Sequence, residues 1–176
     1  MNSSVNISHI ENLLWTPVKT KPRCEKKLAK FCTPHNIICY LPLRKSVRRY
    51  QRRSIEFFIP MFSGYVFCLL DHDKLQKLVF CNAFAYKIAM NEYSEKILID
   101  ELNSVQIIEK SQEFTTITVR PEIVSGAKIL IKNGPFKGMA GIVERRKDST
   151  VISINIEILG QSATTVIDIE DIETND

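Results

Sequence analysis

The sequence predicts an α+β N-terminal domain followed by a small β-barrel, and three observations support this prediction. Residues 1–110 hold 17 Lys and Arg against 10 Asp and Glu, whereas residues 111–176 hold 7 against 10. Apolar residues up to position 110 alternate between helical and extended spacing, and beyond residue 121 their period becomes two. A chain of 176 residues is long enough for two such domains.

Four segments follow from these changes in pattern. They are a disordered N-terminus over residues 1–12, an antiparallel sheet flanked by helices over 13–110, a linker over 111–121, and the barrel over 122–176.

The first expected elements are a strand and a helix. LLWTPVKT is typical of a strand, and Pro17 favours a place near a sheet edge because proline lacks the N–H that a central strand uses. In KPRCEKKLAKFC the residues Cys24, Leu28 and Cys32 fall on one apolar stripe, which predicts a helix that ends at Pro34.

The middle of the domain is expected to be extended. NIICYLPL predicts a second strand, and SIEFFIP and FSGYVFCLL predict a further extended pair that is broken at Pro60 and Met61. Between them, RKSVRRYQRR holds six basic residues and no acid, so it predicts an exposed hairpin or loop.

Two further helices complete the domain. DHDKLQKLVF predicts a short helix with Asp71 or Asp73 as its cap, and NAFAYKIAM is expected to be strand-like. SEKILIDELNSVQIIEK has the clearest helical spacing in the chain, and we expect Ser94 to be its N-cap.

The C-terminal region has strict alternation. Ile152, Ile154 and Ile156 alternate with Ser153 and Asn155, which predicts a strand with one buried face. Several short strands joined by glycine-containing turns within about 55 residues are typical of a small barrel.

One of these turns carries a motif. NGPFKGMAG follows an alternating strand and resembles the KOW motif. Domains that carry this motif are small SH3-like barrels found in transcription elongation factors and some ribosomal proteins. The motif residues here are Gly134, Phe136, Gly138 and Gly141.

The N-terminal region carries a second motif. It resembles the NGN domain of the NusG transcription elongation factors in four successive segments: WTPVKTKPRCEKKLA, YLPL, a basic stretch and PMFSGYVF. Together with the KOW motif, the resemblance covers Trp15 to about Ile172. Ser63 and Gln161 depart from the housekeeping pattern, and so does the Thr16–Pro17 pair. These departures favour a specialised paralog.

The resemblance implies a polymerase-binding surface. In the family the PMFSGYVF region forms a hydrophobic depression for the clamp helices of the largest subunit of bacterial RNA polymerase, and this implies roles for Phe62, Tyr65 and Phe67. Strand alternation alone leaves open the alternative that these rings are core residues.

The resemblance also implies contact with non-template or upstream DNA. The first helix and the basic hairpin would supply the cations, and the ring of Tyr50 could stack on a base. The candidate residues are Lys21, Arg23, Lys27, Arg48, Arg49, Arg52 and Arg53. A solvated charged surface is the alternative.

The expected protein is a cytoplasmic monomer without a membrane span, catalytic residues, cofactor or metal. The five cysteines lie among apolar residues and are expected to be reduced thiols. A zinc or thiol site at Cys32, His35 and Cys39, with Cys24 nearby, is a weaker alternative. The KOW domain would recruit a small-subunit ribosomal protein or the termination factor Rho. A ribosome-associated KOW-type RNA-binding protein is the alternative function.

Overall fold

The computed structural model describes residues 5–51, 53–110, 117–121, 127–131, 136–146 and 149–167. The chain divides into two compact units. Unit 1 comprises Met1–Leu43 and Pro60–Asp100, and unit 2 comprises Arg44–Ile59 and Glu101–Asp176.

Unit 1 is built on a four-stranded antiparallel sheet in the order β2-β5-β1-β6. The strands are β1 (Leu14–Thr20), β2 (Cys39–Tyr40), β5 (Tyr65–Leu70) and β6 (Phe84–Lys87). The helices are α1 (Glu25–Cys32), which continues into the 3-10 turn η1 (Thr33–His35), α2 (His72–Val79) and the start of α3 (Glu92–Lys110).

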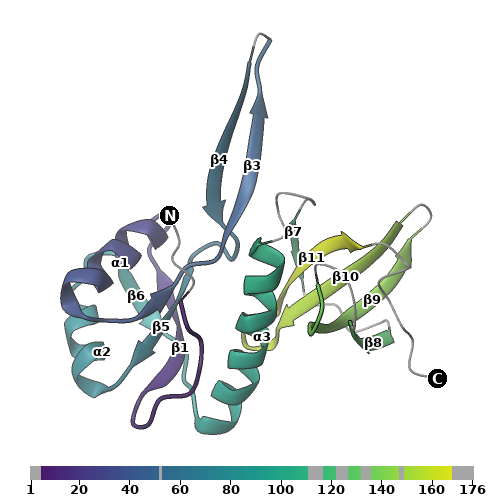
Figure 1. The fold of residues 1–176 in the computed structure, drawn as a ribbon. Helices are drawn as coiled ribbons and strands as arrows, with labels where there is room; N and C mark the ends of the chain where they lie inside the picture. The colour runs from purple at the N-terminus through teal and green to yellow at the C-terminus, as the bar shows by residue number, and fades with distance from the viewer. Residues whose placement is uncertain are drawn as a thin grey trace. The chain divides into compact units, whose positions relative to one another are not determined.

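Helices α1 and α2 pack on the same face of this sheet (Figure 1). Leu28 of α1 and Leu78 of α2 are fully buried against Val18 of β1 and Val66 of β5. All five cysteines are free thiols in or beside this cluster, as the apolar neighbours in the sequence predict.

Pro17 lies in a central strand rather than near an edge, which corrects the sequence-based expectation. Strand β1 is flanked by β5 and β6, and the carbonyl of Pro17 accepts the N–H of Ile88, 2.9 Å away and just past the end of β6. In an antiparallel strand the N and C=O of one residue point to the same neighbour. The missing N–H of Pro17 therefore falls where β6 has ended.

The helix caps agree with the sequence in one case and not in the other. Asp71 caps α2, because its Oδ1 accepts the N–H of Lys74 at 2.7 Å. At α3 the Oδ1 of Asn91 accepts the N–H of Ser94 at 2.8 Å, while Ser94 Oγ accepts the N–H of Asn91 at 3.1 Å. Asn91 is thus the N-cap, and Ser94 is its reciprocal partner inside the helix.

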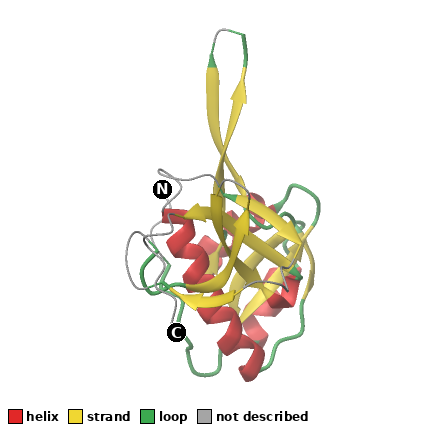
Figure 2. Cartoon of the chain, turned by 90° about the vertical axis from the view of Figure 1, so that its right-hand side faces the viewer, coloured by secondary structure: helices red, strands yellow, loops and turns green. Residues whose placement is uncertain are grey.

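The basic segment forms a two-stranded hairpin of β3 (Leu43–Arg49) and β4 (Ser54–Pro60) (Figure 2). The N–H of Tyr50 donates to Arg53 O at 2.8 Å at the turn, and the N–H of Met61 donates to Pro42 O at 2.8 Å at the base. Both bonds fit one register. SIEFFIP therefore pairs with β3, whereas β5 pairs with β1 and β2.

The C-terminal part of unit 2 is a five-stranded antiparallel sheet in the order β7-β11-β10-β9-β8. The strands are β7 (Thr118–Pro121), β8 (Ala127–Leu130), β9 (Ala140–Arg146), β10 (Ser149–Ile156) and β11 (Gln161–Ile167), with a 3-10 turn η3 (Glu157–Leu159) before β11. This is the small SH3-like architecture expected for a KOW domain. Thr118–Pro121, expected in the linker, forms the strand that pairs with β11.

Strand β10 is buried on both faces, although its sequence predicts one polar face. Ile152 and Ile154 are buried as expected, and Ser153 is also only 1% exposed. The hydroxyl of Ser153 lies 3.0 Å from that of Thr164 on β11, and this hydrogen bond satisfies both buried groups. Within the same unit, Glu101 of α3 accepts the N–H of Glu157 at 3.0 Å.

Candidate functional site

The three aromatic residues assigned to polymerase binding are not equally accessible. Phe62 and Phe67 are 0% exposed, and their rings meet edge to face with centroids 6.0 Å apart. Tyr40 also contacts Phe67, whereas Tyr65 at the start of β5 is half-buried. The expectation of an exposed three-ring surface is therefore corrected: Phe62 and Phe67 are core in this structure, and Tyr65 is the accessible member.

The turn before Tyr65 is tightly fixed. Gly64 has φ +81°, a conformation that residues with a Cβ rarely adopt, and a Cβ there would lie 2.7 Å from Lys19 Nζ. Its N–H donates to Glu25 Oε1 at 2.6 Å, and its carbonyl accepts the N–H of Thr20 at 2.9 Å. The glycine in PMFSGYVF is thus required by its backbone angle, whereas the end of the flexible Lys19 side chain can move to make room for a Cβ.

Lys19 completes this corner. It is the cross-strand partner of Tyr65 on β1, and its Nζ lies 4.0 Å from the centroid of the Tyr65 ring. A cation over an aromatic face is attracted by the ring quadrupole. The sequence reasoning missed Lys19, because the contact depends on the register between two strands far apart in the chain.

The basic residues of the first helix and the turn before it are exposed. Lys21, Arg23 and Lys27 all present their side chains to solvent. The Nζ of Lys21 also donates to Asn82 Oδ1 at 2.7 Å, and Arg23 has φ 59° in the turn that leads into α1. These three residues can offer charge to a phosphate backbone.

The hairpin presents the other candidate cations together with apolar side chains. Arg48, Arg49 and Arg53 are exposed, and Arg52 lies outside the described residues. The guanidinium carbon of Arg48 lies 5.3 Å from the centroid of the Phe57 ring, and Lys45 Nζ pairs with Glu56 Oε1 at 2.7 Å.

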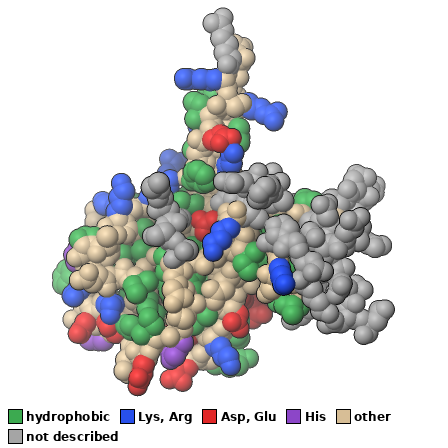
Figure 3. All heavy atoms as spheres, in the orientation of Figure 1, with side chains coloured by type: hydrophobic (Ala, Val, Ile, Leu, Met, Phe, Trp, Pro, Cys, Tyr) green, Lys and Arg blue, Asp and Glu red, His purple; other side chains and the backbone are tan. Residues whose placement is uncertain are grey.

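Apart from Tyr50, the exposed apolar residues on the hairpin were not singled out from the sequence. Tyr50 and Phe58 are 54% and 51% exposed, and Val47 and Ile55 are also exposed. Figure 3 shows blue Lys and Arg side chains on the hairpin with green apolar ones between them. Charge interleaved with exposed rings suits a single strand with unpaired bases.

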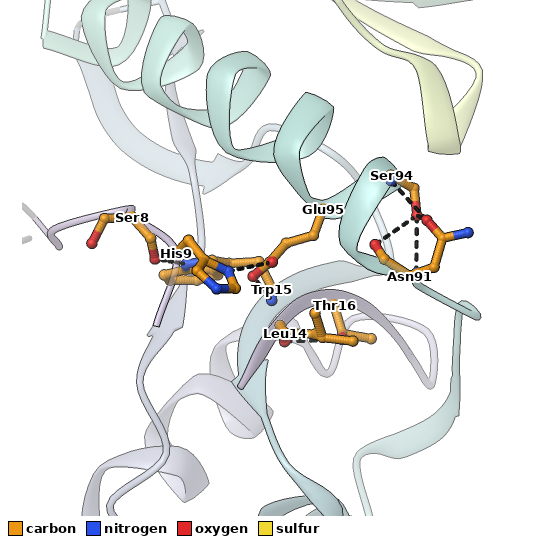
Figure 4. A network of polar contacts seen from close by, with 8 residues as sticks. All are labelled: Ser8, His9, Leu14, Trp15, Thr16, Asn91, Ser94 and Glu95. Atoms are coloured by element: carbon orange, nitrogen blue, oxygen red, sulfur yellow. Dashed lines mark hydrogen bonds and ion pairs between the residues drawn. The ribbon is translucent and has the colours of Figure 1, made fainter. Parts of the chain in front are cut away.

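The buried carboxylate of Glu95 holds the N-terminal segment (Figure 4). Glu95 of α3 is 1% exposed; its Oε1 accepts the N–H of Trp15 at 2.9 Å, and its Oε2 lies 2.8 Å from Nδ1 of His9. The indole N–H of Trp15 donates to Ser8 O at 3.0 Å. Ser8 and His9, which the sequence places in a disordered N-terminus, are thus held by hydrogen bonds to Trp15 and Glu95 in this structure.

The KOW motif residues have structural roles in unit 2. Phe136 is 2% exposed and anchors the turn, and Gly138 adopts φ +85°. A Cβ on Gly141 would lie 2.8 Å from Ile154 Cδ1, so this position permits close packing of β9 on β10. Gly134 lies outside the described residues.

The cysteines form a thiol cluster without metal-binding geometry. A hydrogen bond with Cys32 and burial raise the pKa of the Cys39 thiol. For Cys32 the hydrogen bond with Cys39 lowers the pKa, but the bond with Cys68 and burial outweigh it, so its pKa is also raised. Across the described residues, no group of three or more His, Cys, Asp or Glu side chains could hold a metal ion.

Comparison with known families identifies the N-terminal region. A family model described as "NusG: Transcription termination factor nusG" matches residues 13–120, more than half of the chain. The chain belongs to the NusG family.

Twelve chains of solved structures match this NusG-family protein. One, titled "Domain interaction in Thermotoga maritima NusG", has 17% identity and a TM-score of 0.45, with 90% of this chain and 95% of that chain covered. Another, an MjSpt4:Spt5 complex, has 14% identity and a TM-score of 0.28, with 88% and 98% covered. Comparison with curated proteins gave no match.

Membership of the NusG family gives this chain a role in transcription elongation. The members of this family are non-enzymatic transcription factors. The N-terminal sheet with its helices and the C-terminal antiparallel strands fit the NGN and KOW architecture. Among the described residues, no helix has both the length and the apolar character that crossing a membrane requires.

Proposed function

We propose that this protein is a specialised NusG paralog that binds the clamp helices of bacterial RNA polymerase, contacts DNA near the upstream fork and suppresses pausing or termination. The observation that carries the proposal is the hairpin β3–β4. It presents exposed arginines together with the exposed rings of Tyr50 and Phe58, on strands that pair with no other described strand. Family membership supports the polymerase as the partner.

Tyr65 is the proposed polymerase contact of unit 1. It is half-buried, held in register by β1, and next to the cation of Lys19. An aromatic ring that is already fixed in place loses little conformational freedom on binding. Phe62 and Phe67 would then act by supporting the strand that carries Tyr65, or would reach the polymerase after a rearrangement of what buries them.

The factor acts by binding two states of the polymerase unequally. A ligand with equal affinity for the paused and active states shifts no population, so suppression of pausing requires tighter binding to the active, clamp-closed state. Simultaneous contact with the clamp and the upstream DNA would provide this preference.

The KOW domain is proposed to recruit a second partner, a small-subunit ribosomal protein or Rho, through the sheet edges and the turn around Phe136. The protein would work in the cytoplasm, because its targets are the transcribing polymerase and its associated factors. We propose that it acts as a monomer. Neither proposal requires a cofactor.

The test is partition of the tagged full chain between polymerase and ribosomal subunits. We expect it to cosediment with core RNA polymerase and to be displaced by an isolated clamp-helix fragment. Cosedimentation with ribosomal subunits alone would instead support the ribosome-associated RNA-binding alternative.

A further inference from the structure

Glu25 is a buried carboxylate to which the proposed function gives no role. It is the first residue of α1 and is only 5% exposed, yet it carries an ionisable group. Burying a carboxylate is costly unless strong donors compensate for the lost water. The described donor is the N–H of Gly64, 2.6 Å from Oε1, and the helix N-terminus adds a favourable dipole.

This hydrogen bond holds the peptide that precedes Tyr65. Because the carbonyl of Gly64 accepts the N–H of Thr20, the Gly64 residue is fixed on both its N–H and its C=O. The residue also has φ +81°, so the chain direction at this point depends on these contacts. Tyr65 follows immediately, and its ring direction depends on the orientation of that turn.

The same carboxylate joins two segments that carry proposed contacts. Glu25 follows a turn in which the N–H of Cys24 donates to Lys21 O at 3.1 Å, and this turn presents Lys21 and Arg23 to solvent. Its side chain reaches across 39 positions of sequence to the Gly64 turn. The hydrogen bond between Glu25 and Gly64 thus links the turn that carries Lys21 and Arg23 to the turn that precedes Tyr65.

We infer that Glu25 is a positioning residue that orients Tyr65 for polymerase binding by holding the N–H of Gly64. Lys19 acts beside it, since its ammonium group lies over the Tyr65 ring and occupies the space next to Gly64. This inference rests on the proposed function, because it takes Tyr65 as a polymerase contact.

The first test measures the hydrogen bond in the full chain without polymerase. Glu25→Ala should speed hydrogen exchange of the Gly64 amide while the amides of β5 keep their protection. Glu95→Gln is the matched control, because it alters the other buried carboxylate that accepts a backbone N–H but leaves the Gly64 turn intact. Unchanged exchange at Gly64 in a folded Glu25→Ala variant would overturn the inference.

The second test is a double-mutant cycle on affinity for core RNA polymerase. Glu25→Ala should weaken binding about tenfold, the size of one missing hydrogen bond to a charged group. Glu25→Gln keeps an acceptor oxygen and should restore binding to within about threefold of the wild type. Because Glu25 acts through Tyr65, adding Glu25→Ala to Tyr65→Ala should cause little further loss.

The outcomes separate the inference from the function on which it rests. If Tyr65→Ala keeps wild-type affinity, the proposed contact itself is wrong. If Tyr65→Ala binds weakly and Glu25→Ala binds normally, or if the two losses add, the positioning role is wrong and the contact stands. Should Glu25→Ala fail to fold, Glu25→Asp replaces it in both tests, because the shorter side chain keeps the charge but does not reach the N–H of Gly64, and the same criteria apply.

Discussion

At the residue scale, Tyr65 and Phe67 show how two side chains of one strand face acquire different roles. Both lie on the same face of β5, but Phe67 is enclosed by Phe62 and Tyr40, whereas Tyr65 lies at the strand end beside Lys19. Sequence alternation places both rings on one face and carries no information about what covers each. The sequence also shows Glu25 in its motif but not that its side chain is buried against Gly64.

Phe67→Ala should destabilise the protein strongly. Truncating a fully buried aromatic costs about 3–5 kcal/mol, a large share of the stability of a small domain. Tyr65→Ala, the matched change two residues earlier, should cost much less because Tyr65 is half-buried. Denaturant midpoints for the two variants test this, and equal losses would contradict the assignment of Tyr65 to the surface.

The thiol cluster should be chemically protected in the folded protein. The pKa of both Cys32 and Cys39 is raised, so both remain protonated at pH values where a free thiol ionises. Both should therefore react slowly with a disulfide reagent at mildly alkaline pH until denaturant is added. Since the folded state keeps these protons, stability should fall as pH rises above the ordinary thiol pKa. Rapid labelling of the native protein at both positions would contradict this prediction.

At the element scale, caps and turns decide where helices begin and how the hairpin runs. Asp71 is predictable, because Asp before a helical pattern is a frequent N-cap. Asn91 was missed because Ser94, also a good capping residue, lies three positions later. The central place of Pro17 was missed for a different reason: it depends on where β6 ends, which local sequence does not specify.

Asp71→Ala should lower the free energy of unfolding by about 1 kcal/mol at neutral pH, the usual cost of removing an N-cap. Hydrogen bonds from the side chain and the backbone N–H of Lys74 lower the pKa of Asp71. Its contribution is therefore fully present above the ordinary Asp pKa and is lost as pH falls toward the lowered value. Urea unfolding of both proteins should show a difference at pH 7 that shrinks in acid; a difference independent of pH would contradict the assignment.

Neutralising the hairpin should weaken nucleic-acid binding with little loss of stability. The variant replaces Arg48, Arg49, Arg52 and Arg53 by Gln. For every phosphate that the variant no longer neutralises, the slope of log affinity against log salt should shrink by roughly 0.7 for single strands or 0.9 for duplex. The matched control makes the same charge change at four exposed lysines outside the hairpin and the first helix, Lys77, Lys87, Lys96 and Lys110. An unchanged slope in the hairpin variant, or an equal change in the control, would assign these arginines to a solvated surface.

At the scale of the whole molecule, the sequence predicts two architectures in the right order but does not fix the boundary between them. The change of period and charge identifies an α+β part and a barrel, and the structure confirms both. Thr118–Pro121 has no marked apolar pattern, yet it pairs with β11. Its place in the sheet comes from the partner strand, which is why a reading of local sequence assigned it to the linker.

Residues 1–110 and 117–176 should each unfold cooperatively when expressed alone, because each contains its own sheet and buried apolar residues. A fragment of residues 122–176 should be less stable, since it lacks β7 and leaves an edge of β11 unpaired. Circular dichroism during denaturant titration tests this. A barrel fragment 117–176 that shows no cooperative transition would contradict an autonomous KOW domain.

The lifetime of a defined pause in a reconstituted bacterial transcription reaction tests the central claim most directly. Added full chain should shorten the pause or increase read-through at a terminator, and Tyr65→Ala should lose this effect while its denaturant midpoint stays close to that of the wild type. A wild-type chain that leaves pausing and termination unchanged at saturating concentration would contradict the proposed elongation function. A folded Tyr65→Ala variant that acts like the wild type would contradict the proposed polymerase contact.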